Sequence, residues 1–500
     1  MSVVRCPFQP SKRSTLTTHN SQLNIMQQII LPALVAFLCT SWIFPYILKV
    51  AKVKNIVDNP DARKLQRVPV PVLGGLTVVF GILTGVMSFN LFGNFYDLFP
   101  IFSGIIIILI VGLVDDMISL SPKIRFVIEI ILVLYLIMTT GIRICDFHGL
   151  WGLDAVPAYV SVPLTVFASV GIINAVNLID GVDGYSSGYS IVSSSLFGVM
   201  FHHLGNERMV TLSAIVVASL LPFFFHNVYG KTSKMFIGDA GTLSLGVVFS
   251  MFVTTCLCGH PGTSAVPEGL GLVAFTLAVL CVPVFDTLRV MSARILRGKS
   301  PFSPDKTHLH HLFIELGYSH IGAALSIIGM NLTVVLCWYA AYRLGLSVDM
   351  QLYVVIALGG LSTFVFYPFC KAQLRKDTAL AGMLKRMGEM THAERTRFWQ
   401  LARKWADRSS DKEETVAAVA QTAQPALPSD AYMRQIVKAQ EFLNENRNAD
   451  LSRVKCLLHK MLPREYYDAI ESLQEHQDPK IILQINGGNN TVGVTVGDEQ

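Results

Sequence analysis

The chain has 500 residues, of which 52% are hydrophobic and only 15% are charged, and its formal net charge is +5. A soluble domain carries about a quarter charged residues, so this composition excludes an ordinary soluble protein and indicates that lipid surrounds much of the chain. The nine cysteines include no CxxC pair and the net charge is modest, so we expect neither a disulfide scaffold nor a nucleic-acid partner.

Residues 1–25 are polar and lack the apolar segment that a signal peptide needs. We expect a leader that is disordered or that precedes the true start, for which Met26 is the alternative. Residues 26–371 alternate long apolar stretches with short polar ones, and we expect them to form a transmembrane domain.

About eleven apolar stretches in this domain come near the ~20 residues that a membrane-spanning helix needs. The predicted fold is therefore an all-α integral membrane protein with about eleven transmembrane helices and a mostly helical soluble tail. The centres of the stretches lie near Phe37, Gly81, Ile106, Leu132, Val166, Leu196, Ala218, Val248, Ala278, Val334 and Ala357.

Basic residues collect in the loops after the first, third, seventh and ninth stretches, within residues 49–67, 123–125, 231–234 and 294–306. By the positive-inside rule, these odd-numbered loops face the cytoplasm. The N-terminus is then outside, and the long C-terminal tail is inside.

Five clusters of polar residues fall in loops of this same parity. They lie at residues 58–75, 115–116, 177–184, 238–241 and 305–311. Random scatter over ten loops would rarely put all five on one side, so we expect them to be parts of a single site at the cytoplasmic face.

Asp115 and Asp116 stand together at the end of the third apolar stretch. Adjacent carboxylates repel each other, so each needs a cation, a proton or water. A solvated helix end explains this pair as well as metal coordination or general-base chemistry does.

The run NAVNLIDGVDG, residues 174–184, is more specific. Its amide and carboxylate side chains are spaced three apart along one helical face, which suits a hard cation and a phosphorylated substrate. These side chains are Asn174, Asn177, Asp180 and Asp183. An EF-hand is excluded because the ligand spacing of that motif is absent.

In FIGDAG, residues 236–241, Asp239 is an isolated carboxylate between glycines. The glycines let backbone N–H groups approach an anion, while Asp239 offers a metal ligand and Phe236 an aromatic face for a nucleobase. Taken alone, the segment is also explained as a glycine turn with a capping aspartate.

The run PDKTHLHH, residues 304–311, gathers three imidazoles at His308, His310 and His311. Zinc is the rival ligand for these side chains. Because no cysteine is near and the flanking residues are basic, we expect contacts to phosphate or sugar instead.

Two basic segments add further candidates for phosphate contacts. Lys123 follows the acidic pair, and Arg63 and Lys64 belong to the loop 58–75. The alternative role for that loop is a positive-inside anchor.

Together, Asp115-Asp116, NAVNLIDGVDG, FIGDAG and PDKTHLHH resemble the polyprenyl-phosphate N-acetylhexosamine-1-phosphate transferase superfamily, glycosyltransferase family 4. The resemblance covers residues 28–371, in the same order along the chain. The histidine run is similar to the N-acetylglucosamine-1-phosphate branch rather than to the muramyl-pentapeptide branch. One departure is Gln66, which stands where close relatives carry a histidine.

The resemblance implies that Asp239 is the direct ligand of Mg²⁺, with Asn177 beside it and Mn²⁺ as an alternative ion. It implies that Asp115 and Asp116 lie beside the nucleophile, with Asp115 as the base. Asp180 and Asp183 are implied as further catalytic carboxylates. The residues expected around the substrates are Asn177, Phe236 against uracil, His308, His310, His311, Lys123, Arg63 and Lys64.

The implied reaction transfers an N-acetylhexosamine-1-phosphate from a UDP-sugar, expected to be UDP-N-acetylglucosamine, to undecaprenyl phosphate. UMP leaves, and a lipid-linked cell-surface glycan is started at the cytoplasmic face of a bacterial inner membrane. Repulsion between two anionic substrates is the main barrier, and Mg²⁺ with Lys and His donors would neutralise it. Direct attack by the lipid phosphate is favoured because that phosphate is already ionised near pH 7.

The tail lies outside the resemblance. Residues 372–410 are basic and helical in pattern, and Phe398, Trp399 and Trp405 indicate an interfacial or docking helix. We expect residues 411–430 to form a linker and residues 431–500 to form a small helical module. The flexible end of this module has the alternating pattern of apolar residues that is typical of a strand. The tail is a candidate for binding a protein partner, and a homodimer is left open.

Two rival functions follow from the same sequence. A phospho-N-acetylmuramoyl-pentapeptide transferase shares the expected fold, and a panel of UDP-sugars separates it. A secondary transporter also has buried polar groups, but it places them near the bilayer midplane on broken helices. Here the carboxylates lie at the ends of the apolar stretches.

Overall fold

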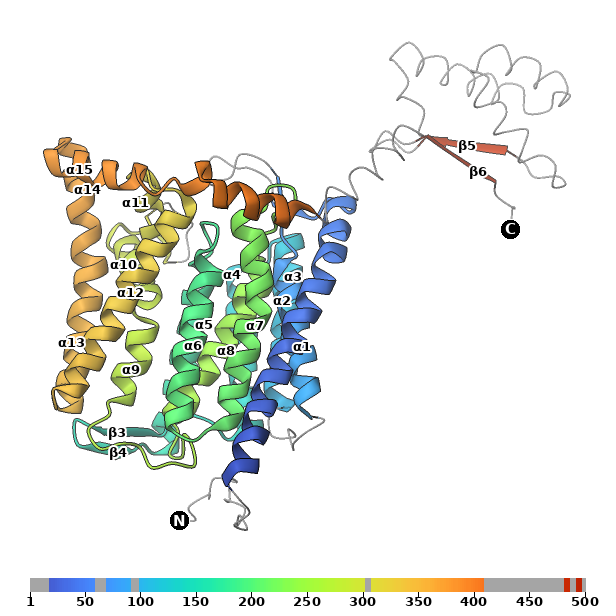
Figure 1. The fold of residues 1–500 in the computed structure, drawn as a ribbon. Coiled ribbons are helices and arrows are strands. Elements are labelled where there is room, and N and C mark those ends of the chain that lie inside the picture. Colours follow the sequence, from blue (N-terminus) through green and yellow to red (C-terminus); the bar gives the residue numbers. More distant parts are fainter. Residues whose placement is uncertain are drawn as a thin grey trace, which may run out of the picture. The chain divides into compact units, whose positions relative to one another are not determined.

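The computed structural model describes residues 18–58, 69–90, 99–301, 307–408, 481–485 and 492–496, and helices dominate it (Figure 1). The chain divides into two compact units, residues 1–412 and 413–500. The predicted linker 411–430, most of the predicted module 431–500 and residues 1–17 of the predicted leader lie outside the described residues.

Helices of the first unit follow one another with short connections. They are α1 (Thr18–Val53), α2 (Gly74–Asn90), α3 (Phe99–Ile118), α4 (Pro122–Thr140), α5 (Ala158–Asn177), α6 (Tyr185–His203), α7 (Glu207–Tyr229), α8 (Gly238–Cys256), α9 (Leu272–Val279), α10 (Cys281–Leu296), α11 (Leu309–Glu315), α12 (His320–Arg343), α13 (Val348–Gly360), the π-helical turn η2 (Leu361–Val365), α14 (Phe366–Lys376), α15 (Ala379–Glu389) and the 3₁₀ turn η3 (Ala393–Arg395). A last helical stretch covers residues 397–408.

Each of the eleven predicted centres lies within one of these helices. Among the described residues, seven helical segments are long and apolar enough to cross a membrane, and an eighth is added if the bent pair α9–α10 counts as one span. Helix α2 is apolar but short, and α4 and α6 are not among the candidates. The fold is therefore a multi-pass helical membrane protein, whereas the count of eleven stays a prediction.

Helix α8 is the central helix of the first unit, and 94% of its most apolar 18-residue stretch is buried inside the protein. Small residues allow this close packing. A Cβ on Gly75 of α2 would lie 2.1 Å from the backbone nitrogen of Gly241, and one on Gly112 of α3 would lie 2.4 Å from the Cα of Ala240. The first turn of α8 is thereby held against α2 and α3.

Helices α9 and α10 bend by 72° at Leu280. The backbone groups freed by the bend are satisfied by side chains of other helices: Asn331 Oδ1 accepts from the Val282 N–H (2.9 Å), and Asn331 Nδ2 donates to the Val279 carbonyl (2.9 Å). The Tyr189 hydroxyl also donates to Val279 (2.7 Å). A broken helix is tolerated inside a membrane bundle when its polar groups are satisfied in this way.

The helix ends that carry the polar residues gather at one end of the bundle, where α3, α5 and α7 end and α8 begins (Figure 1). A two-stranded antiparallel sheet, β1 (Val57–Asp58) with β2 (Val70–Pro71), precedes α2. A second hairpin, β3 (Asp146–Leu150) with β4 (Leu153–Ala155), lies at the opposite end of the bundle.

The described part of the second unit is one antiparallel hairpin. Strand β5 (Ile481–Ile485) pairs with β6 (Val492–Val496) in a register that matches Ile481 to Val496 and Ile485 to Val492. The strand-like alternation of this stretch thus corresponds to two strands. In the first unit, α1 begins at Thr18, so its backbone helix starts inside the predicted leader.

Candidate active site

A cavity of about 960 Å³ opens at the polar end of the bundle, and residues from all five polar clusters line it. The loops that separate these clusters in the chain are thus folded around one space. The predicted site residues that line the cavity are Asp115, Asp116, Asn177, Asp180, Asp183, Phe236, Asp239, His308, His310 and His311.

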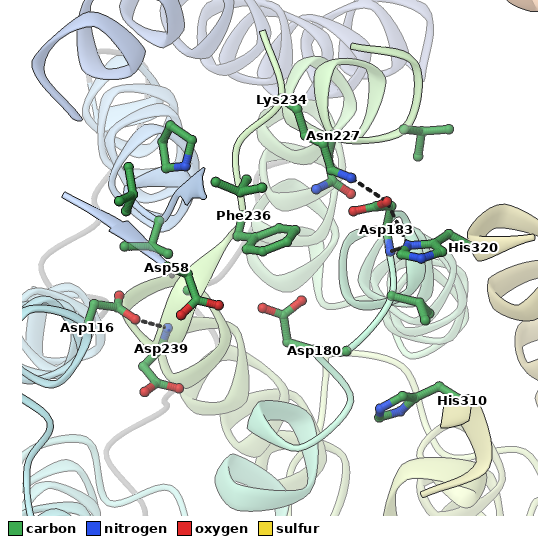
Figure 2. Close-up of a pocket in the computed structure, with 18 of the residues that line it drawn as sticks. Asp58, Asp116, Asp180, Asp183, Asn227, Lys234, Phe236, Asp239, His310 and His320 are labelled. Atoms are coloured by element: carbon green, nitrogen blue, oxygen red, sulfur yellow. Dashed lines mark hydrogen bonds and ion pairs between the residues drawn. The ribbon is translucent and has the colours of Figure 1, made fainter. Parts of the chain in front are cut away.

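Asp116 joins the end of α3 to the start of α8. Its two carboxylate oxygens accept hydrogen bonds from the backbone N–H groups of Asp239 (2.8 Å) and Ala240 (3.1 Å) (Figure 2). The first N–H groups of a helix have no partner within the helix, and a carboxylate there also meets the positive end of the helix dipole. Gly238, with φ of 67°, makes the approach feasible, because a Cβ there would lie 2.6 Å from Asp116 Oδ2.

Asn177 orients the carboxylate of Asp239. Its amide Nδ2 donates to Asp239 Oδ1 (2.6 Å) and to Thr242 Oγ1 (2.9 Å). These contacts use the donor side of the amide, so Asn177 orients Asp239, the predicted metal ligand. That Asn177 is itself a metal ligand stays a prediction.

Arg125 of α4 lies between two of the carboxylates. Its Nη1 is 3.0 Å from Asp115 Oδ2 and 3.9 Å from Asp239 Oδ2, and its Nε is 3.7 Å from the fully buried Glu129. The other oxygen of Asp115 accepts from the Leu120 N–H (2.7 Å). Both oxygens of Asp115 are therefore engaged, and its predicted role as a base stays untested.

Asp180 follows α5 and projects into the cavity, where Figure 2 shows its carboxylate between Asp239 on one side and Asp183 on the other. Removal from bulk water, with smaller contributions from the negative charges of Asp239, Asp183 and Asp58, raises the pKa of Asp180 to about 7, against a hydrogen bond from Ser186 that lowers it. The neighbourhood of Asp180 thus has an excess of negative charge.

Asp183, in contrast to Asp180, lies beside basic side chains. Its Oδ2 is 2.6 Å from Lys234 Nζ and 2.7 Å from His320 Nδ1 (Figure 2). Burial raises the pKa of Asp183, but the contacts with His320 and Lys234 outweigh burial and hold that pKa below its usual value. Asp183 is therefore ionised and fixes Lys234 at the cavity wall.

Phe236 lies at the middle of the cavity wall, with its backbone tied to the segment before α2. Its N–H donates to the Pro71 carbonyl (2.7 Å), and its carbonyl accepts from the Gly74 N–H (2.9 Å). Lys234 Nζ is 5.7 Å from the centre of the Phe236 ring. The aromatic face and the ammonium group are thus neighbours, as a nucleotide site requires.

The histidine run is fixed from α10. His308 Nδ1 lies 3.0 Å from Asp286 Oδ2, and Arg289 donates to the other oxygen of Asp286 (2.7 Å). With Nδ1 engaged, Nε2 is the ring nitrogen that His308 has left for a ligand.

His310 packs on Gly181 of the acidic loop, because a Cβ on Gly181 would lie 2.1 Å from His310 Nε2. Burial lowers the pKa of His310 well below its usual value, and the neighbouring His311 and His308 lower it further. His310 is therefore neutral near pH 7.

Both acidic and basic side chains line the cavity. Carboxylates of Asp58, Asp116, Asp180 and Asp239 gather on one side, and the basic lining residues are Lys52, Lys231, Lys234 and Arg294. Among the described residues, no group of three or more His, Cys, Asp or Glu side chains is arranged to hold a metal ion by itself. Mg²⁺ usually takes one or two carboxylates and completes its shell with waters and substrate phosphates.

Some predicted residues are not brought to the cavity. Lys123 is exposed on the first turn of α4 and does not line it, because Arg125, two residues on, takes the inward position. Arg63 and Lys64 lie outside the described residues.

The charged or titratable residues that were not predicted as site residues include Arg125, Lys234, Asp286 and His320. The first two were counted only as positive-inside residues. Charged side chains inside or beside apolar stretches are costly unless paired, and that signal identifies such residues as site candidates.

Known proteins with a similar sequence were found by comparison. The model of glycosyl transferase family 4 matches residues 98–257. The chain is 31% identical over 358 residues to a probable undecaprenyl-phosphate N-acetylglucosaminyl 1-phosphate transferase of Bacillus subtilis, an overlap of 69% of this chain and 96% of the relative.

Two further relatives are named undecaprenyl-phosphate alpha-N-acetylglucosaminyl 1-phosphate transferase. That of Escherichia coli O157:H7 is 28% identical over 288 residues, which covers 57% of this chain and 76% of the relative. That of Yersinia pestis is 28% identical over 310 residues, which covers 58% of this chain and 81% of the relative.

Proposed function

Because the chain belongs to glycosyl transferase family 4, we propose that it transfers N-acetylglucosamine-1-phosphate from UDP-N-acetylglucosamine to undecaprenyl phosphate and releases UMP. The product starts a lipid-linked cell-surface glycan. The observation that carries the proposal is one cavity that is lined by carboxylates, by basic side chains and by the ring of Phe236.

In the proposed reaction, an oxygen of the lipid phosphate attacks the β-phosphorus of the UDP-sugar. The bond from that phosphorus to the bridging oxygen breaks, and the electron pair leaves with UMP. The lipid phosphate is already ionised near pH 7, so no covalent enzyme intermediate and no strong base are required.

The side chains of the cavity have separate tasks in this proposal. Lys234, held by Asp183, donates a hydrogen bond to the diphosphate. His308, held by Asp286, forms a hydrogen bond with the substrate through Nε2. Phe236 stacks on uracil. Arg125 balances the charge of Asp115 and Asp239, so that the anionic substrates can approach.

A Mg²⁺ ion fits the acidic side of the cavity, because the carboxylates of Asp116, Asp180 and Asp239 line it there. Asp239 would hold the ion, with Asp180 and Asp116 near it, and Mn²⁺ is an alternative. Bound there, the ion would neutralise charge that develops on the diphosphate. Asn177 would keep the Asp239 carboxylate oriented.

The proposal includes a place in the cell. The cavity faces the cytoplasm of a bacterial inner membrane, with the N-terminus outside and the C-terminal tail inside, and about eleven helices cross the bilayer. The basic residues in loops around the cavity support this orientation. A homodimer and a protein partner for residues 413–500 belong to the same proposal as secondary features.

The deciding experiment uses purified full-length protein in detergent with undecaprenyl phosphate, UDP-N-acetylglucosamine and Mg²⁺, and follows the release of UMP. We expect release that stops with EDTA and falls at least about a hundredfold in Asp239→Asn, because a charged group that acts in the transition state is removed. Asp349→Asn, at the opposite end of the bundle, is the matched control.

The same assay with a panel of UDP-sugar donors separates the alternative functions. Release from UDP-N-acetylmuramoyl-pentapeptide but not from UDP-N-acetylglucosamine would assign the muramyl branch. No UMP from any UDP-sugar, with folded protein and an acceptor that a known transferase accepts, would reject the reaction and leave transport to be measured.

A further inference from the structure

The helical stretch of residues 397–408, here called the strap helix, lies across the cavity end of the bundle after the last membrane helix (Figure 1). It packs on the end of α7 through aromatic rings. The rings of Trp405 and Phe225 are 5.1 Å apart, and those of Trp399 and Tyr229 are 4.7 Å apart. The strap helix lies beyond residue 371, where the sequence resemblance to the transferase superfamily ends.

Asp407 of the strap helix holds the loop between α7 and α8. Its Oδ1 accepts hydrogen bonds from the backbone N–H groups of Lys231 (3.0 Å), Thr232 (3.0 Å) and Ser233 (2.9 Å). Asp407 is only 7% exposed. Burial raises the pKa of Asp407, but these N–H donors outweigh burial and lower that pKa below its usual value, so the carboxylate is charged.

The loop held by Asp407 is a wall of the cavity. Lys231, Thr232 and Lys234 all line it, and Lys234 reaches Asp183. The loop is thereby fixed from two sides, by Asp407 through its backbone and by Asp183 through the Lys234 ammonium group. A shift of the loop would move this ammonium group relative to any diphosphate in the cavity.

Trp399 of the strap helix lines the cavity itself. Its side chain is 6% exposed, and its Nε1 is buried without a hydrogen-bond acceptor among the described residues. A buried N–H without an acceptor costs free energy, and a water or a ligand that reached it would remove that cost.

We propose that the strap helix completes the active site: Asp407 is a positioning residue that holds Lys234 in place through the 231–233 backbone, and Trp399 donates a hydrogen bond to the bound UDP-sugar. This inference rests on the proposed function, since it adds residues to the same site. It extends the site beyond the predicted catalytic domain of residues 26–371.

The first test measures the loop directly and needs no activity. Amide hydrogen exchange at residues 231–233 is compared in full-length wild type, Asp407→Asn and the control Asp377→Asn, whose carboxylate is 86% exposed. We expect exchange to accelerate about tenfold or more in Asp407→Asn only, because charged acceptors form the stronger hydrogen bonds. Unchanged exchange would overturn the role of Asp407.

The second test links the loop to the reaction. Asp407→Asn should lower kcat/KM about ten- to a hundredfold, the loss expected for hydrogen bonds to a charged group. In a Lys234→Met background the same change should cost almost nothing, because Asp407 acts through Lys234. Additive losses, or an unchanged kcat/KM despite faster exchange, would contradict the positioning role.

Trp399→Phe keeps the ring and removes the donor. We expect KM for the UDP-sugar to rise about tenfold with kcat nearly unchanged, as for the loss of a contact made equally in the ground and transition states. An unchanged KM would overturn the donor role. If wild type releases no UMP, the proposed function fails, whereas the exchange measurement still decides whether the strap helix holds the loop.

Discussion

Asp180 and Asp183 are three residues apart, yet their surroundings change their acidities in opposite directions. Burial, with a smaller contribution from the neighbouring carboxylates, raises the pKa of Asp180 to about 7, whereas contacts with His320 and Lys234 lower the pKa of Asp183. One short loop therefore presents a group ready to accept a cation and a group that already holds one.

The raised pKa of Asp180 predicts a linkage between protons and Mg²⁺. The pKa of Asp180 is near 3.8 in the unfolded chain and about 7 in the folded chain. Between these pH values the folded chain keeps a proton that the unfolded chain has lost, so the free energy of unfolding falls as pH rises through this window. A bound cation relieves this penalty. We expect Mg²⁺ to raise Tm more at pH 8 than at pH 5.5, and its apparent affinity to weaken below pH 7.

Thermal unfolding in detergent at several Mg²⁺ concentrations measures this linkage. In Asp180→Asn the dependence of the Mg²⁺ effect on pH should become weaker, because one of the titrating carboxylates near the ion is gone. An equal Mg²⁺ effect on Tm at both pH values in wild type would contradict the assignment of the cation to this loop.

The close contact between Gly181 of the acidic loop and His310 of the histidine run can be tested with a larger side chain at position 181. Alanine at this position would put a Cβ 2.1 Å from His310 Nε2, and His310 is only 4% exposed and has little room to move. We expect UMP release to fall about a hundredfold, the cost of misplacing catalytic groups by about 1 Å.

Gly171→Ala is the matched control, because a Cβ on Gly171 meets nothing within 4 Å. Its activity should equal that of wild type, and Tm should show that both variants fold. Full activity in Gly181→Ala would mean that the position of His310 does not matter for the reaction.

At the scale of the elements, helix α8 positions the site. It is buried along its length, and its first turn carries Asp239 and receives Asp116 from α3. Since Gly75 and Gly112 leave no room for a Cβ beside this turn, α2 and α3 hold it in one place. Rigid elements place catalytic groups more precisely than loops do.

The bend between α9 and α10 predicts an effect on stability. Asn331, 2% exposed, satisfies the Val282 N–H and the Val279 carbonyl at the bend. Asn331→Leu should destabilise the protein by about 1–2 kcal/mol, the range for hydrogen bonds between membrane helices.

Tm in detergent checks this prediction, with Thr333→Val as the control, because Thr333 is exposed and bonds only to the preceding turn of its own helix. Activity should fall as well, since α10 carries Asp286, which fixes His308. An unchanged Tm would show that the bend does not depend on Asn331.

At the scale of the whole molecule, the cavity and the β3–β4 hairpin lie at opposite ends of the bundle. The basic loops share the end with the cavity, and the acceptor phosphate of a polyprenyl lipid lies at the level of the headgroups. An active site built at one end of a membrane bundle therefore meets its lipid substrate where the lipid is charged.

Orientation is tested by labelling introduced cysteines in intact cells with a membrane-impermeant maleimide. Glu268→Cys, in an exposed loop after α8, should react before lysis, and Lys299→Cys, in the exposed loop after α10, only after lysis. This follows from the positive-inside rule. The reverse pattern would put the cavity on the outer face and reject the proposed topology.

Periodicity and composition were sufficient for the broad fold. Apolar stretches of membrane length predict helices because lipid offers no partner for backbone groups, and each predicted centre lies in a helix. The alternation of basic and neutral loops grouped Asp116, Asp180, Asp239 and His310 correctly around one cavity, because membrane helices reverse direction at each crossing.

What only the tertiary structure decided is which partner each charge has. Arg125 and not Lys123 turns inward, Asp286 fixes His308, and Asp407 holds a loop about 175 positions earlier in the chain. These contacts depend on the rotation and packing of helices that are distant in sequence, and local patterns of hydrophobicity and charge carry no information about them. The sequence by itself therefore determined the class of protein and predicted many of the residues that line the cavity, whereas packing decided their geometry and their charged partners.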